Sequence, residues 1–226
     1  MVLFVLLCTA VGLVVGAWAN QLIVRAPERD RELRVSLLAP PLATLPSTRR
    51  EQIVIVVMGL SWAAMALRFG VDWTVVPYLA GVTSMVAVSF IDLDTMRIPD
   101  RITFPTMAIV AALVAAIAAG IDDLDSMLGS AIGALAFSGV LFVLWFIYPK
   151  GMGFGDVKYA VVLGALVGWI SPLLVSFALL ASSLLGTIVG IAVIVRAGDR
   201  KKAFPFGPWL CLGTAIVICF SDALLP

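Results

Sequence analysis

Residues 173–195 read LLVSFALLASSLLGTIVGIAVIV and contain no charged side chain. A helix needs about 20 apolar residues to cross a bilayer, so this stretch is long enough to span one. The rest of the chain is similar, because 62% of its 226 residues are hydrophobic, only 13% are charged and the mean hydropathy is +1.12. Soluble domains are about half apolar and about a quarter charged. The sequence therefore predicts an all-α, polytopic membrane protein.

Seven other apolar runs accompany this one, and together they predict about eight transmembrane helices. The eight runs cover residues 2–24, 52–67, 73–90, 102–119, 127–148, 159–170, 173–195 and 209–225. Ala17 and Ala19 in the first run imitate a signal-peptidase site, but no Lys or Arg precedes that run and several follow it. Signal peptides have the opposite charge pattern, so we interpret the first run as a retained helix.

The basic residues are distributed unevenly among the connections. Of the 15 Lys and Arg residues, all but Arg68 fall in alternate connections, at residues 25–51, 97–101, 150–158 and 196–202. Positive charge near the ends of spans is held in the cytoplasm, so these connections are predicted to be cytoplasmic and the N-terminus to be outside. The 14 acidic residues nearly balance the basic ones, which leaves no basic face for nucleic acid.

The connection at residues 25–51 is the longest polar stretch, with four prolines and mixed charges. It predicts a cytoplasmic linker with at most one amphipathic turn, around residues 33–38, and not a second domain. We therefore expect residues 1–226 to form a single transmembrane domain.

Two residue types limit the chemistry of the protein. The chain has no histidine, which excludes Ser-His-Asp and Cys-His triads, HExxH zinc hydrolases and haem or copper sites that need imidazole. Cys8, Cys211 and Cys219 lie in apolar runs without CxxC spacing, so we interpret them as buried small side chains. The sequence predicts neither a metal site nor a disulfide framework.

Two of the predicted cytoplasmic junctions carry carboxylates. Residues 90–101 read FIDLDTMRIPDR and residues 151–158 read GMGFGDVK. Two carboxylates brought together from separate helices share one proton, because repulsion prevents both from ionising. The ionised member can then draw a proton from water while the protonated member polarises a peptide carbonyl, as in aspartic proteases. This chemistry needs neither a metal nor a histidine.

The carboxylates of the first junction have different expected roles. Asp92 and Asp94 point about 200° apart on a helix, so only one of them is expected to be catalytic. Asp100, together with Pro99, is interpreted as the start of the next helix. The structural alternative for all three carboxylates is helix capping or pairing with Arg97 and Arg101.

The second junction predicts a polar segment at membrane depth. The run that follows it, residues 159–170, is too short to span unless the GFGD segment enters the membrane and lines a hydrated cavity. We expect Gly153 and Gly155 to adopt positive φ and to let a substrate strand pass close to the backbone. An aspartate such as Asp156 at the centre of a span costs about 2.5–3.5 kcal/mol, so a functional role is favoured over a plain turn.

Several motifs, in order, resemble those of the type IV prepilin leader peptidases, which are polytopic GxGD aspartyl proteases. They are IDLD at residues 91–94, IPD at residues 98–100 with Thr103 after it, GFGDVK at residues 153–158 and FPFGP at residues 204–208. The first run, from Gly12 to Arg25, also resembles the opening helix of that family. The resemblance covers most of the chain.

The resemblance implies that Asp92 and Asp156 are the catalytic pair. It implies a bacterial inner-membrane enzyme whose partners are the lipid bilayer and prepilin or pseudopilin precursors, cleaved after a leader glycine at the cytoplasmic face. Lys158 is expected to orient the loop, to stabilise negative charge or to snorkel, and the FPFGP segment is expected to form a rigid turn before the last helix. The residues expected to shape the site are Gly153, Gly155, Lys158, Asp94, Pro99 and Asp100.

The chain departs from the family in one segment. Many bacterial members carry two CxxC pairs, which suggest zinc, after the first helix, and methylate the new N-terminus with S-adenosylmethionine. The corresponding residues 25–51 are cysteine-free here, so the zinc module is missing. We expect proteolysis to need no cofactor, and S-adenosylmethionine only if methyltransferase activity is retained.

Two other functions fit part of the pattern. A proton- or cation-coupled transporter could use the same intramembrane aspartates, although the sequence shows no inverted repeat. An inactive homologue that acts as an assembly scaffold is opposed by the presence of both aspartates and both glycines.

Overall fold

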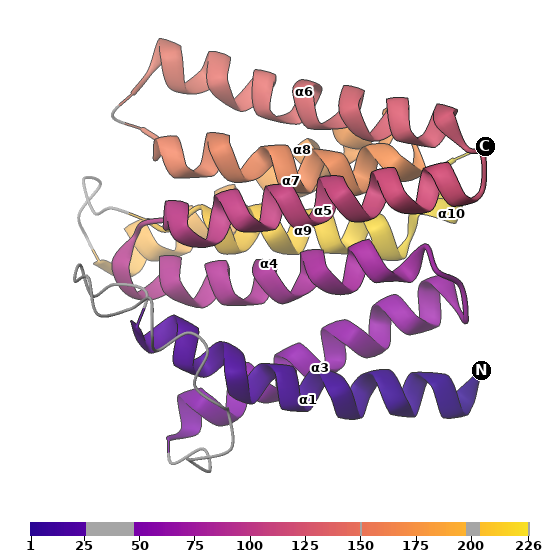
Figure 1. Cartoon of the computed structure of the whole chain (residues 1–226). Coiled ribbons are helices and arrows are strands. Elements are labelled where there is room, and N and C mark those ends of the chain that lie inside the picture. Colours follow the sequence, from indigo (N-terminus) through magenta and orange to yellow (C-terminus); the bar gives the residue numbers. More distant parts are fainter. Residues whose placement is uncertain (26–47, 150, 198–203, 226) are drawn as a thin grey trace.

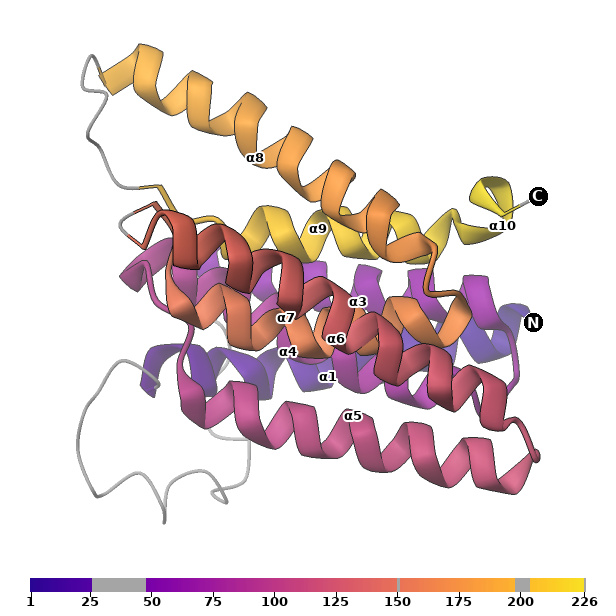
Figure 2. The ribbon, with the colours of Figure 1, turned by 90° about the horizontal axis from the view of Figure 1, so that it is seen from above.

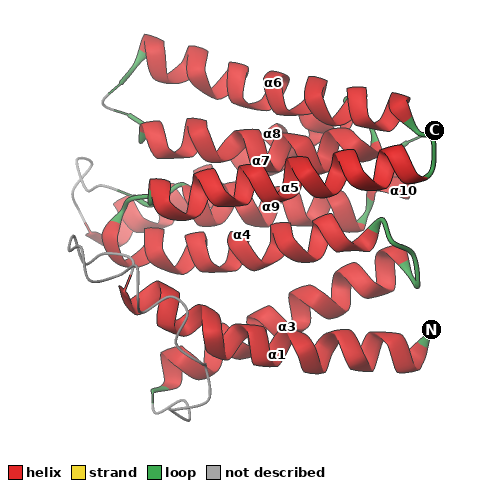
Figure 3. Ribbon diagram, in the orientation of Figure 1, coloured by secondary structure: helices red, strands yellow, loops and turns green. Residues whose placement is uncertain are grey.

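The computed structural model describes residues 1–25, 48–149, 151–197 and 204–225, and these residues form helices and no strand (Figure 3). The long helices lie in one bundle with their connections at its two ends (Figure 1). The all-α prediction is confirmed. The helices are α1 Val2–Arg25, α3 Arg49–Phe69, α4 Val75–Thr95, α5 Asp100–Gly120, α6 Leu124–Ile147, α7 Phe154–Ile170, α8 Leu174–Ala197, α9 Gly207–Cys219 and α10 Ser221–Leu224.

Within the described part of the chain, six helices are long and apolar enough to cross a membrane, namely α1, α3, α4, α5, α6 and α8. Helix α7 has 17 residues and α9 has 13. The chain therefore has the composition and helix lengths of a multi-pass membrane protein. The count of eight spans and the outside location of the N-terminus stay predictions. The predicted turn at residues 33–38 and the basic residues at positions 150 and 200–202 lie outside the described residues.

Helices α3 and α6 each begin three residues before the apolar run that predicted them, because a side chain caps the start of each helix. The Thr48 hydroxyl accepts the Glu51 N–H at 3.2 Å and the Glu51 carboxylate accepts the Thr48 N–H at 3.3 Å, which forms a capping box at the start of α3. The Asp123 carboxylate accepts the Ser126 N–H at 3.0 Å at the start of α6, and hydrogen bonding from Ser126 lowers the pKa of Asp123. Hydropathy alone does not register these polar first turns.

The last predicted run, residues 209–225, is not one helix. Helix α9 ends at Cys219 and the short α10 begins at Ser221. The carbonyl of Ile218, which would continue the helix, instead accepts hydrogen bonds from Arg68 Nε at 3.3 Å and from the Ser221 hydroxyl at 3.0 Å. Arg68 also forms an ion pair with Asp222. Arg68 therefore links α3 to α10.

Helices α4 and α7 lie at the centre of the bundle and are mostly buried. Buried polar contacts join them: the Tyr78 hydroxyl donates to the Leu166 carbonyl at 3.0 Å, and the hydroxyls of Ser84 and Tyr159 are 2.7 Å apart. Unpaired polar groups are expensive in an apolar core, so these bonds fix how the two helices face each other. The carboxylate junctions lie at the ends of these same two helices.

Helices α6 and α7 approach closely through glycines spaced four residues apart. A Cβ at Gly133 of α6 would lie 2.4 Å from the Gly164 carbonyl oxygen, and a Cβ at Gly168 of α7 would lie 2.4 Å from the Gly129 carbonyl oxygen. This is the small-residue packing by which membrane helices associate. Helix α8 instead diverges from α6 and α7 toward the end of the bundle at which α9 begins (Figure 2).

We expect Gly133→Ala to lower the free energy of unfolding by about 1–3 kcal/mol, because its methyl group would overlap the α7 backbone. The matched control is Gly139→Ala on the same helix, where nothing lies within 4 Å of an added Cβ. The control should leave stability unchanged or raise it slightly, since Ala favours helix over Gly. Unfolding of both variants in a detergent titration checks this, and equal effects of the two substitutions would contradict the packing argument.

Candidate active site

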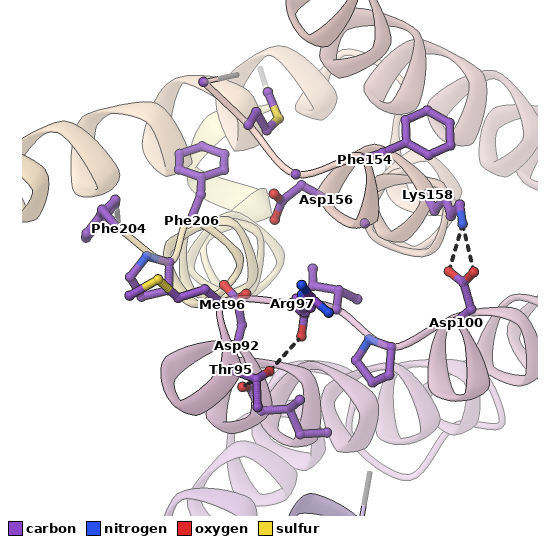
Figure 4. Close-up of a pocket in the computed structure, with 18 of the residues that line it drawn as sticks. Asp92, Thr95, Met96, Arg97, Asp100, Phe154, Asp156, Lys158, Phe204 and Phe206 are labelled. Atoms are coloured by element: carbon purple, nitrogen blue, oxygen red, sulfur yellow. Dashed lines mark hydrogen bonds and ion pairs between the residues drawn. The ribbon is translucent and has the colours of Figure 1, made fainter. Parts of the chain in front are cut away.

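A cavity of about 1140 Å³ lies at the end of the bundle where α4 ends and α5, α7 and α9 begin (Figure 4). Residues from three segments line it, at positions 91–101, 151–158 and 204–206. These segments carry the three motifs that follow one another in the sequence. The cavity is thus built where the sequence motifs meet, and its walls mix aromatic and charged side chains.

Asp92 lies in the last turn of α4 and is 4% exposed. The helix ends just after it, because Met96 adopts the left-handed conformation with φ 53° and its N–H bonds the Asp92 carbonyl at 2.8 Å. The Asp92 side chain points into the cavity (Figure 4). Its Oδ2 accepts a hydrogen bond from the N–H of Gly207, the first residue of α9, at 3.0 Å.

Asp156 lies in the first turn of α7, faces the same cavity and is 7% exposed. Its Oδ1 is buried and has no hydrogen-bond partner among the described residues. Its Oδ2 turns back toward Gly153, where an added Cβ would be 3.2 Å away. The carboxyls of Asp92 and Asp156 face each other across the cavity and interact electrostatically (Figure 4).

The prediction that Gly153 and Gly155 adopt positive φ is wrong. Helix α7 already begins at Phe154, so Gly155 is helical, while Gly153 caps the helix with an extended backbone at φ −71° and ψ 138°. The close approach at Gly155 is real, but the neighbour is the chain itself. A Cβ at Gly155 would lie 3.0 Å from the Ile98 Cβ and 3.3 Å from the Ile98 carbonyl oxygen. Gly155 therefore allows the α4–α5 connection to lie against α7.

Asp92 and Asp94 point in different directions, as expected for residues two apart on a helix. Asp94 is exposed, lies outside the residues that line the cavity and forms an ion pair with Arg50 at the start of α3. The Arg50 guanidinium also lies over the Phe90 ring, 5.8 Å from its centroid. Asp94 thus links α4 to α3, and Asp92 alone of the two reaches the cavity.

Asp100 begins α5 after Pro99, as predicted, but its partner is Lys158 rather than Arg97 or Arg101. Lys158 Nζ lies 2.8 Å from both Asp100 oxygens and 5.4 Å from the centroids of the Phe104 and Phe154 rings. The ion pair joins α5 to α7 at the rim of the cavity. Pro99 lines the cavity beside it.

Sequence reasoning missed the part played by Gly207. The FPFGP segment was expected to be a rigid turn, and it does lead into α9, but its glycine also supplies the N–H that binds Asp92. A Cβ at Gly207 would lie 2.8 Å from Asp92 Oδ2, so only glycine lets the carboxylate come so close. The available signal was a glycine directly before Pro208 at the start of an apolar run.

None of the three cysteines is among the residues that line the cavity. Cys8 and Cys211 are buried, as predicted, and Cys219 is half-buried. Among the described residues, no group of three or more Cys, Asp or Glu side chains is arranged to hold a metal ion.

The fold and the site together define a helical membrane protein with two buried carboxyls facing one cavity. Residues 79–191 match the sequence model of the Type IV leader peptidase family. The chain belongs to this family. The matched residues include the IDLD, IPD and GFGD motifs, whereas FPFGP lies beyond them.

Curated relatives carry the name prepilin leader peptidase/N-methyltransferase. The protein of Aeromonas hydrophila is 32% identical over 189 residues, which cover 79% of this chain and 61% of the relative. The protein of Myxococcus xanthus is 30% identical over 88% of this chain and 67% of its own length. The protein of Pseudomonas putida is 29% identical over 96% of this chain and 72% of its own length. The chain thus spans about three fifths of the length of the Aeromonas relatives. No solved structure matches the chain significantly.

The Lys158–Asp100 pair should contribute little to stability. The two side chains are 27% and 53% exposed, and ion pairs in such surroundings are worth about 0–1 kcal/mol. A double-mutant cycle of Lys158→Met and Asp100→Asn, followed by detergent unfolding, is expected to give a coupling free energy below about 1 kcal/mol. A coupling of several kcal/mol would show that the pair holds α5 against α7.

Proposed function

We propose that this protein is a membrane-embedded aspartic endopeptidase that removes the leader of type IV prepilin or pseudopilin precursors. The observation that carries the proposal is the placement of Asp92 and Asp156, from two central helices, face to face in one cavity. Family membership and the printed name of the relatives support the class of substrate. They also favour a peptidase over a cation-coupled transporter.

The proposed reaction uses the two carboxyls and one water molecule. The ionised carboxyl takes a proton from the water, which attacks the carbonyl carbon of the leader glycine, and the protonated carboxyl donates to the carbonyl oxygen. The resulting diol collapses when the leaving amine receives a proton. Proteolysis of this kind needs no cofactor, and S-adenosylmethionine enters only if the new N-terminus is methylated.

The cavity is large enough for a segment of peptide. Its volume of about 1140 Å³ exceeds the roughly 300–1,000 Å³ of small-molecule sites. Met152, Phe154 and Phe206 supply apolar wall, and Asp92 and Asp156 supply the acidic centre. We propose that the leader lies in this cavity while the apolar helix of the precursor stays in the lipid beside the bundle.

The location of the cavity is proposed to be the cytoplasmic face of the bacterial inner membrane. Arg50, Arg97, Arg101 and Lys158 belong to helix ends and connections at the cavity end of the bundle, and Arg68 belongs to the other end (Figure 1). This distribution supports a cytoplasmic cavity, because positive charge near span ends is held inside the cell.

Asp92→Asn and Asp156→Asn should each reduce cleavage by about 10²–10⁴-fold or more, because each removes one partner of the proton transfer. The assay incubates detergent-purified protein with a synthetic prepilin that has a basic leader ending in glycine. Mass spectrometry of the product N-terminus then reports cleavage position and methylation together. Asp94→Asn is the matched control and should retain activity, because Asp94 pairs with Arg50 outside the cavity. Retained processing by either purified cavity variant would falsify the proposed pair.

Gly207→Ala should lower kcat about 10–100-fold with little change in KM, because the methyl group would displace Asp92 from a hydrogen bond to the backbone. The matched control is Gly190→Ala on α8, where an added Cβ would meet the Phe204 ring at 4.0 Å, an ordinary contact. Steady-state kinetics on the same prepilin compare the two variants. Wild-type kcat for Gly207→Ala would show that the hydrogen bond to Asp92 is dispensable.

A further inference from the structure

The two carboxyls of the cavity have different hydrogen-bond surroundings. Asp92 Oδ2 accepts the Gly207 N–H at 3.0 Å, and this donor belongs to a different helix, α9, at its positively polarised N-terminus. A backbone donor held rigidly against a buried carboxyl stabilises the ionised form of that carboxyl. This hydrogen bond therefore favours the ionised form of Asp92.

Asp156 lacks such a donor on one of its oxygens. Its Oδ2 turns back toward Gly153 at the start of its own helix, so the N-terminus of α7 serves that oxygen. Its Oδ1 is buried, and no donor reaches it from the described residues. A buried oxygen that carries charge without a donor is costly, whereas a protonated oxygen at the same place is itself a donor that a substrate carbonyl can accept from. Asp92 Oδ1 also has no donor among the described residues, but it is not among the fully buried polar atoms, so the two carboxyls differ in the burial of their unpartnered oxygen.

The charged groups around the pair do not reverse this difference. Lys158 of α7 is neutralised by Asp100 of α5 at 2.8 Å. Arg97 and Arg101 line the cavity, but within the described part of the chain neither forms an ion pair with the two carboxyls. Cys211, one turn beyond Gly207 on α9, is a buried thiol and adds no positive charge beside the pair.

We propose that Asp156 holds the proton that the pair shares and that Asp92 is the ionised member, so that Asp92 is the base and Asp156 the acid of the peptidase reaction. The catalytic meaning of this assignment rests on the proposed function. Asp92 takes a proton from water as the water oxygen bonds to the carbonyl carbon, and the proton of Asp156 passes to the carbonyl oxygen. Asp156 then takes a proton from one diol hydroxyl, and Asp92 gives its proton to the nitrogen as the carbon–nitrogen bond breaks. Both carboxyls return to their starting states.

Infrared spectroscopy of the purified protein at pH 7, without substrate, tests the assignment. A protonated carboxyl has a carbonyl stretch separate from those of carboxylates and amides, and this band shifts in D₂O. The wild type should show the band, Asp156→Asn should lose it and Asp92→Asn should keep it. Asp94→Asn is the matched control and should keep the band, because Asp94 is exposed and paired with Arg50.

Three results would overturn the assignment: a wild-type protein without the band, an Asp156→Asn protein that keeps it, or an Asp92→Asn protein that loses it. If Asp156→Asn does not fold, Asp156→Ser removes the same carboxyl with a smaller side chain and is read in the same way. The spectra involve no cleavage. Failure of the wild type to cleave prepilin therefore counts against the proposed function, and the band decides the location of the proton separately.

Discussion

The position of the Asp92 carboxyl in the cavity depends on its hydrogen bond from the Gly207 N–H. The Asp92 carboxyl is buried, and within the described part of the chain no Lys or Arg forms an ion pair with it. An unpaired buried charge is expensive, so the carboxyl needs another donor. The donor is a backbone group, the Gly207 N–H at the start of α9, which lies 3.0 Å from Asp92 Oδ2. Glycine is needed there because a Cβ would lie 2.8 Å from the same oxygen. This bond connects the start of α9 to the end of α4 and holds the side chain that faces Asp156.

The second constraint is that the helix carrying Asp156 must lie close to its neighbours. Helix α7 meets α6 through Gly164 and Gly168, and at its first turn Gly155 allows Ile98 to approach within a distance that a Cβ would obstruct. The same helix is tied to α4 by the bond from Tyr78 to the Leu166 carbonyl. Small residues bring the backbones together and buried hydroxyls set their register, so the position of Asp156 follows from packing along the whole of α7.

Much of this arrangement could be predicted because it depends on patterns that are local in sequence. Apolar runs located every long helix that the structure describes, and helical geometry correctly separated Asp92 from Asp94. Some errors were local, such as the conformation of Gly153 and the capped starts of α3 and α6, and the others arose where contacts distant in sequence decide the structure. Arg68 binds the Ile218 carbonyl from 150 positions away, Asp100 pairs with Lys158 across two helices, and the backbone donor to Asp92 comes from a residue 115 positions away. No spacing rule within one segment reports such partners.

The residues directly before Gly207 contact helix α8, so α8 contributes to the position of the hydrogen bond to Asp92. Phe206 lines the cavity on one side and lies against α8 on the other, where a Cβ at Gly186 would be 2.7 Å from its ring. Phe204 lines the cavity beside it and stacks on Trp209 with ring centroids 6.2 Å apart. Because Phe206 directly precedes the glycine that binds Asp92, the contact with α8 and the hydrogen bond share one short piece of backbone. Helix α8, which diverges from α6 and α7, is therefore connected to the Asp92 carboxyl through the consecutive residues Phe206 and Gly207 (Figure 2).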